Sequence, residues 1–157
     1  MIEQIYTYFT IEMIFMWLNL GVLPFWMVLI VFPQSQICKV FVASIFPIFI
    51  LSLAYGYLIY LFFNEGYDFI RNFELYLGLD AVSNLFADRT FIILFWLHFL
   101  AMNLFCGGWI VKDSQKFGIN KILMSFPLLI TYFIGPIGLT FYWIMRVFYS
   151  KSINLYD

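Results

Sequence analysis

Charged side chains are scarce in this 157-residue chain: Asp, Glu, Lys and Arg make up 11% of it, against about 25% in typical soluble domains. The eight Lys and Arg residues and nine Asp and Glu residues leave a net charge of −1, which excludes the basic surface that nucleic-acid binding requires. Only two cysteines, Cys38 and Cys106, and one histidine, His98, occur. We therefore expect no disulfide scaffold, no zinc-type metal site and no bound cofactor.

Apolar side chains are present in excess. Hydrophobic residues reach 64%, aromatic residues reach 24%, and phenylalanine alone occurs 21 times. A water-soluble fold of this length cannot bury so much apolar surface. The composition therefore excludes a soluble enzyme or a disordered chain and indicates an integral membrane protein.

Four stretches reach the roughly 20 apolar residues that a membrane-spanning helix needs. They cover about residues 11–32, 40–63, 91–111 and 122–147. The N-terminus has no basic stretch and no small-residue cleavage pattern, so we expect the first stretch to be a span and not a signal peptide. Helices are expected because the bilayer offers no partners to free backbone groups. The sequence predicts an all-α fold: a single transmembrane domain over residues 1–157 with four transmembrane helices, in a bacterial inner (plasma) membrane.

The long connection between the second and third stretches carries much of the charge. Within it, Leu75, Leu79, Val82 and Phe86 fall on one face of a helix. This pattern predicts an interfacial amphipathic helix over about residues 73–86. A lid segment packed on the bundle is the alternative.

Basic residues in the loops predict the orientation of a membrane protein. The two short loops are the denser in basic residues and hold Lys39, Lys112, Lys116 and Lys121. The termini and the long loop hold Arg71, Arg89, Arg146 and Lys151. We therefore expect the short loops in the cytoplasm and both termini outside. Arg146 and Lys151 near the C-terminus favour the opposite orientation.

Polar side chains inside the first span are costly, by about 2.5–3.5 kcal/mol for a charge at the bilayer centre, and they point to candidate sites. Glu12 and Asn19 lie two turns apart and share a face that Trp26 continues. Glu12 is either a solvated interfacial carboxylate or part of a site. Asn19 is either a ligand contact or a partner in an interhelical hydrogen bond.

The third span carries His98, the single histidine. His98, Phe105 and Trp109 share a face, Asp113 lies about 60° away, and Asn103 points about 140° from His98. A buried neutral imidazole binds a polar ligand group or moves a proton, whereas a hydrogen bond to a neighbouring span is the structural alternative. For Asp113 the alternative is a solvated helix end.

Small residues mark the rest of the third span and the fourth. Gly107 and Gly108 allow close approach of a helix or a flat ligand. In the fourth span Pro136 should kink the helix. One face there forms a small-residue groove that either packs against a helix or admits a lipid or a rigid polyene; its residues are Thr131, Gly135, Gly138 and Tyr142.

Three segments, taken in order, resemble one family. They run from Asn19 to Trp26, from His98 to Asp113, and from Phe133 to Leu139 with Tyr142 and Arg146 after it. In this order over about residues 11–146 they resemble the abscisic-acid-deficient-four-like, or neoxanthin-synthase-like, membrane proteins. The family pattern has an acid where this chain has Asn103 and often a basic residue where it has Gly108.

The resemblance implies a carotenoid-related activity, because the plant member is tied to the isomerisation of violaxanthin to neoxanthin. Opening an epoxide to an allene needs an acid at the epoxide oxygen and a base beside the polyene. On this hypothesis the catalytic residues are His98 with Asp113 or Glu12, without a metal or redox cofactor. The ligand-binding candidates are Asn19, Trp26, Asn103, Trp109, Thr131, Gly135, Gly138 and Tyr142.

Two other functions stay open. One is a non-catalytic protein that binds a pigment or lipid, and the other is a small subunit of a membrane complex. A cavity shared by His98 and Asp113 would favour chemistry, whereas a smooth apolar groove would favour binding. The expected partners are membrane lipid, a hydrophobic small molecule such as a carotenoid, and further copies of the chain. A transporter is disfavoured because no internal repeat is found.

Overall fold

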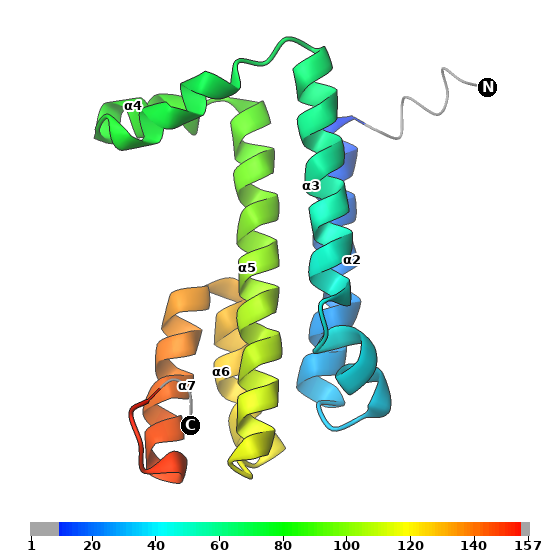
Figure 1. The fold of residues 1–157 in the computed structure, drawn as a ribbon, viewed down its shortest axis with the longest axis vertical. Coiled ribbons are helices and arrows are strands. Elements are labelled where there is room, and N and C mark those ends of the chain that lie inside the picture. The colour runs from blue at the N-terminus through cyan, green and yellow to red at the C-terminus, as the bar shows by residue number, and fades with distance from the viewer. Residues whose placement is uncertain (1–9, 155–157) are drawn as a thin grey trace, which may run out of the picture. The chain divides into compact units, whose positions relative to one another are not determined.

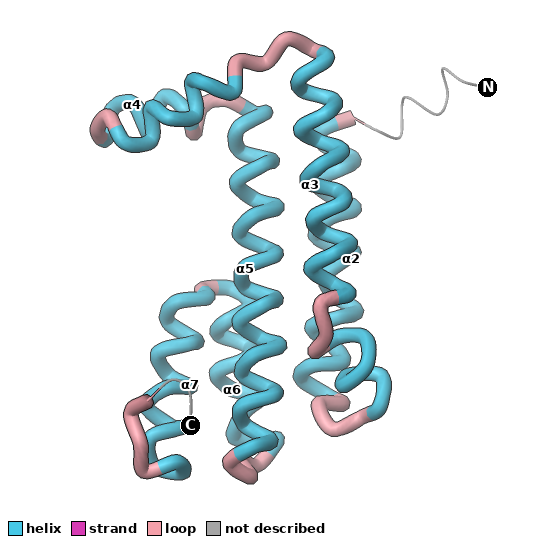
Figure 2. The backbone as a smooth tube through the Cα atoms, viewed as in Figure 1, coloured by secondary structure: helices cyan, strands magenta, loops and turns pink. Residues whose placement is uncertain are grey.

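The computed structural model describes residues 10–154, and this part of the chain is helical with no strand (Figure 1). Short loops connect the helices (Figure 2). The elements in chain order are α2 (Ile11–Val31), η2 (Cys38–Val42), α3 (Phe46–Asn64), η3 (Phe69–Tyr76), α4 (Leu79–Leu85), α5 (Arg89–Lys116), α6 (Lys121–Phe133) and α7 (Gly135–Ser150). The predicted all-α class is confirmed.

Three helices, α2, α3 and α5, are long and apolar enough to cross a membrane. They contain 21, 19 and 28 residues. At about 1.5 Å per residue they extend about 32, 28 and 42 Å, against a hydrocarbon core of about 30 Å. The chain is therefore a small membrane protein, and the spans expected at 11–32 and 91–111 match α2 and α5.

The second span starts later than the sequence predicts. Residues 38–42 form a short π-helical turn, and α3 begins only at Phe46. Ser44 separates the two, because its hydroxyl donates to the carbonyl of Phe41 at 2.8 Å and accepts from the backbone N–H of Phe46 at 3.1 Å. A side chain that satisfies a free N–H at a helix start favours beginning the helix there.

The fourth predicted span, 122–147, is wrong as one transmembrane helix. Helix α6 ends at Phe133, Ile134 is extended (φ −140°, ψ 81°), and α7 begins at Gly135. Pro136 lies in the first turn of α7, where its missing N–H costs nothing, whereas inside a continuous helix it would remove a hydrogen bond. The chain reverses at this point, and α6 and α7 pack as an antiparallel hairpin (Figure 1).

Contacts between residues divide the chain into two compact units. Unit 1 comprises residues 1–21 and 50–100, and unit 2 comprises residues 22–49 and 101–157. Helices α2, α3 and α5 each contribute to both units. The described part of each unit has its own buried residues and is considered by itself below.

In unit 1 the segment between α3 and α5 forms two short helices in place of the single helix expected over 73–86. Asp68 caps the 3₁₀ helix η3 by accepting from the N–H of Ile70 at 2.9 Å. Gly78, with φ 128°, breaks the chain before α4, and this backbone conformation favours glycine. Large apolar side chains are exposed along the segment, namely Ile70, Phe73, Tyr76, Leu77 and Leu79.

In unit 2 glycines allow the helices to approach closely. A Cβ atom on Gly107 would lie 2.8 Å from the ring of Trp26, and one on Gly138 would lie 2.6 Å from the Cα of Thr131. Trp26 is buried, and its ring meets the ring of Tyr132 edge-on at 5.4 Å. For Gly107 and Gly138, helix packing is therefore the role that the structure describes.

Candidate functional site

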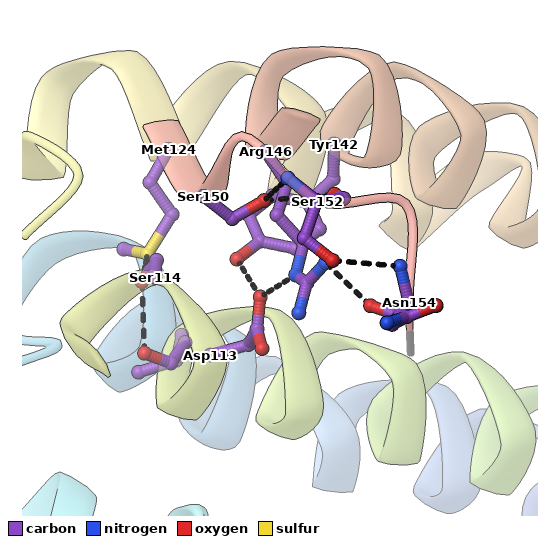
Figure 3. A network of polar contacts seen from close by, with 9 residues as sticks. Asp113, Ser114, Met124, Tyr142, Arg146, Ser150, Ser152 and Asn154 are labelled. Atoms are coloured by element: carbon purple, nitrogen blue, oxygen red, sulfur yellow. Dashed lines mark hydrogen bonds and ion pairs between the residues drawn. The ribbon is translucent and has the colours of Figure 1, made fainter. Parts of the chain in front are cut away.

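A buried ion pair joins α5 and α7 in unit 2 (Figure 3). Oδ2 of Asp113 accepts a hydrogen bond from the hydroxyl of Tyr142 at 2.6 Å and from Nε of Arg146 at 2.7 Å. Tyr142 and Arg146 lie one turn apart on α7 and are fully buried, and Asp113 is 9% exposed. Asp113 is thus not the solvated helix end considered as an alternative.

Aromatic rings and the C-terminal segment cover the guanidinium of Arg146. Its Cζ lies 4.6 Å from the ring centroid of Phe117 and 5.5 Å from that of Trp143. Its Nη1 donates to the carbonyl of Asn154 at 2.8 Å. Such contacts offset part of the desolvation cost of a buried ion pair. The residues that follow α7 therefore fold back over the network (Figure 3).

A groove of about 420 Å³ lies beside this network in unit 2. One wall is residues 42–45 with Pro47 and Ile48, and the other is the face of α5 that carries Phe105, Gly108, Trp109 and Lys112. The volume falls in the range typical of small-molecule sites, about 300–1,000 Å³. Apolar side chains form most of the lining, and the ammonium group of Lys112 is the one charge in it.

Trp109 connects the groove to the ion pair. Its ring lines the groove and meets the ring of Tyr142 edge-on, with centroids 5.6 Å apart and an interplanar angle of 88°. Because Tyr142 is itself held by Asp113, the network fixes the wall of the groove. Gly108 leaves the neighbouring surface open, since an added Cβ would reach only ordinary contact, 3.9 Å, with the Cα of Ala43.

Two other buried side chains of unit 2 are Cys38 and Asn103. Burial raises the pKa of the Cys38 thiol above its ordinary value, so it stays protonated at neutral pH and is a poor nucleophile. Asn103 is also buried, and its side chain lies against Gly135. Its Nδ2 has no hydrogen-bond partner among the described residues.

The candidate residues of unit 1 are more open. Glu12 pairs with Arg89 at 2.8 Å, and both side chains are largely exposed. Asn19 accepts a hydrogen bond from the indole of Trp96 at 3.1 Å and donates to the carbonyl of Phe15 at 2.7 Å. His98 is exposed on α5 and has no hydrogen bond within residues 10–154. Asn19 thus makes the interhelical hydrogen bond considered above.

The structure brings several predicted residues together within unit 2. Asp113, Tyr142 and Trp109 form one cluster, Asn103 meets Gly135, and Thr131 meets Gly138. His98 belongs to unit 1 and precedes Asp113 by 15 residues in the sequence of α5.

Sequence analysis missed the pairing of Asp113 with Arg146. A signal for it exists, because Asp113 is the only acidic residue from Arg89 to Tyr156. A carboxylate in such an apolar region needs a cation, and Tyr142 and Arg146 share a helical face.

A comparison with family models decides the identity of the chain. The model described as ABA DEFICIENT 4-like matches residues 13–142. The chain belongs to the ABA DEFICIENT 4-like family. No curated protein and no solved structure matches it.

The ABA DEFICIENT 4-like match extends from the first turn of α2 to Tyr142 in α7. It includes the groove, Trp109 and Asp113, and it ends one turn before Arg146. The resemblance to this family is confirmed.

Proposed function

We propose that this ABA DEFICIENT 4-like protein binds an elongated apolar ligand of the isoprenoid class, such as a carotenoid, in the groove of unit 2. The observation that carries the proposal is the groove itself, about 420 Å³ with an apolar lining and a wall made by Trp109. Family membership supports the ligand class.

The groove suits a stiff, flat ligand. Gly108 presents no side chain to it, so a conjugated chain can lie close to the α5 backbone. Trp109 is held by Tyr142, so its ring is already in place before the ligand binds. Preorganised aromatic walls reduce the entropy lost on binding and so favour affinity.

The orientation of the protein in the membrane follows from three spanning helices and the hairpin of α6 and α7. Because the chain reverses between α6 and α7, Lys151 lies on the same side as the basic residues of both short connections, and not outside with the N-terminus as the four-span prediction had it. Arg71 and Arg89 lie at the other ends of the spanning helices. The positive-inside rule assigns the first side to the cytoplasm of a bacterial plasma membrane. The exposed apolar side chains of η3 and α4 then contact lipid at the opposite surface.

Pigment carried by the purified protein tests the binding proposal. The chain is expressed in bacterial hosts that make β-carotene, zeaxanthin or violaxanthin, and the pigment in the purified protein is measured by chromatography. We expect Gly108→Leu to reduce this pigment at least about tenfold, because the leucine occupies the groove. Gly21→Leu is the matched control, since a Cβ on Gly21 meets no atom within 4 Å.

Two results would contradict binding in the groove. One is a wild-type protein that carries no pigment from any of the hosts. The other is a Gly108→Leu protein that carries as much pigment as the wild type.

Isomerisation of a carotenoid is the second candidate function, and the observation that favours it is His98 of unit 1. A histidine that is exposed on a membrane-spanning helix without a hydrogen bond in the described chain is costly unless it acts on a ligand. Opening an epoxide to an allene moves one proton from carbon to the epoxide oxygen, so the step needs no oxidant or reductant. The engagement of Asp113 by Arg146 favours His98, and not Asp113, as the group that moves this proton.

Conversion in the violaxanthin-producing host tests this second function. We expect a new product with the wild type and none with His98→Ala. Equal conversion by both proteins would remove His98 from the mechanism, and absence of any product with the wild type would leave binding as the function.

A further inference from the structure

A second hollow, of about 700 Å³, lies at one end of unit 2. It forms where the connection between α2 and α3 meets the turn between α5 and α6. The amide of Gln115 joins the two segments by donating to the carbonyl of Pro33 at 2.7 Å. The polar side chains of the lining are Gln34, Lys39, Gln115, Asn120 and Lys121.

Positive charge in unit 2 is not balanced by carboxylates. Its described residues include one acidic side chain, Asp113, and this is buried against Arg146 at 2.7 Å. They also include six basic side chains: Lys39, Lys112, Lys116, Lys121, Arg146 and Lys151. Lys39 and Lys121 therefore face the hollow with no carboxylate partner in the described part of the chain.

The position of Lys121 adds to this imbalance. It is the first residue of α6, and the first turn of that helix has no acidic residue. A cation at the N-terminus of a helix is repelled by the helix dipole. An anion between Lys39 and Lys121 would offset both this repulsion and that between the two ammonium groups.

The surroundings of the hollow suit a lipid better than a free ion. Ile37, Val40 and Ile122 flank the lysines and are 61%, 51% and 75% exposed. The hollow also lies just beyond the C-terminal ends of α2 and α5, where lipid headgroups meet a spanning helix. An anionic lipid would place its phosphate at the lysines and its chains on the apolar side chains.

We propose that this hollow binds the phosphate of an anionic membrane phospholipid, with Lys39 and Lys121 as the paired cations. The exposed aliphatic side chains beside them contact the acyl chains. Basic pockets between membrane helices on the cytoplasmic side are suited to such headgroups. The proposal is independent of the ligand in the groove, so Gly108→Leu leaves it unaffected.

Native mass spectrometry of the full chain in detergent tests the proposal, with phosphatidylglycerol as the probe and zwitterionic phosphatidylcholine as the comparison. Each surface lysine contributes about 1 kcal/mol, which corresponds to about a fivefold change in apparent Kd. We expect about fivefold weaker phosphatidylglycerol binding for Lys39→Gln and for Lys121→Gln, and about 30-fold for the double variant.

Two variants act as controls. Lys116→Gln removes a lysine that is also exposed, at the end of α5, and that does not line the hollow, and we expect less than about a twofold change. The double variant Lys39→Arg/Lys121→Arg keeps the charge, and we expect it to bind as the wild type does. Because the substituted side chains are exposed, none of these changes disturbs the core.

Three results would overturn the proposal. The first is an unchanged Kd in the double glutamine variant. The second is a loss in Lys116→Gln as large as that in Lys39→Gln, which would indicate diffuse attraction by the whole basic end. The third is displacement of phosphatidylglycerol by millimolar inorganic phosphate, which would assign the hollow to a soluble anion.

Discussion

The ion pairs of the two units differ in burial. Unit 1 keeps its ion pairs near the surface: Glu12 with Arg89 is largely exposed, and Arg71 reaches Asp88 at 3.5 Å with both side chains partly exposed. Unit 2 buries the pair Asp113 and Arg146. From this difference in burial we expect similar residue types to contribute differently to stability. A buried pair fixes two helices, whereas an exposed pair contributes little because water and salt screen it.

Removing the buried carboxylate should have the largest effect. Asp113→Asn leaves the guanidinium of Arg146 buried without its counter-charge, which we expect to lower the free energy of unfolding by about 3–5 kcal/mol. Unfolding by SDS in mixed micelles measures this loss. The double variant Asp113→Asn/Arg146→Met removes both charges and should recover most of it. A loss below about 1 kcal/mol in the single variant would contradict this expectation, because the buried pair would then contribute no more to stability than the exposed pairs do.

Glycine-to-alanine substitutions should have the next largest effects, and these should change stability in opposite directions in the two units. A Cβ on Gly138 in unit 2 would overlap Thr131, so Gly138→Ala should destabilise by about 1–3 kcal/mol. A Cβ on Gly56 in unit 1 meets no atom within 4 Å, so Gly56→Ala should stabilise helix α3 by about 0.5–1 kcal/mol. The same SDS unfolding measures both, and equal effects would refute the tighter packing of unit 2.

Much of the fold could be predicted from the sequence. Helices α2 and α5 were expected because apolar runs of about 20 residues have the length of a spanning helix, which satisfies its own backbone hydrogen bonds in a bilayer. A kink at Pro136 was expected, but the end of α6 at Phe133 and the reversal of the chain after it were not. A proline predicts a kink, whereas a reversal depends on Gly138 fitting against Thr131, which is a tertiary contact.

The candidate site was only partly predictable. Helical periodicity placed His98, Phe105 and Trp109 on one face of α5, and of these Phe105 and Trp109 line the groove. The role of Asp113 depended on Arg146, which is 33 residues away in the sequence and adjacent only after the hairpin forms. Periodicity within one helix carries no information about such a pairing.

The hydrogen bond between spans in unit 1 should have a moderate effect. Asn19→Ala removes the acceptor of the Trp96 indole N–H, which we expect to cost about 0.6–1.7 kcal/mol. Trp96→Phe removes the donor. The loss of stability in the double variant should be about 0.6 kcal/mol smaller than the sum of the losses in the two single variants. If the two single losses add fully in SDS unfolding, the hydrogen bond does not couple the stability of these two helices.

The exposed pair of unit 1 should have the smallest effect. Glu12→Gln removes one charge from a pair whose side chains are 68% and 79% exposed, so we expect a loss below about 1 kcal/mol. The Debye length falls to about 3 Å in 1 M salt, so the difference from the wild type should shrink further there. The loss in Asp113→Asn should persist in the same salt, because ions do not reach a buried pair. A loss in Glu12→Gln that is large and insensitive to salt would show that Glu12 is desolvated in the membrane, and the contrast between the two units would then not hold.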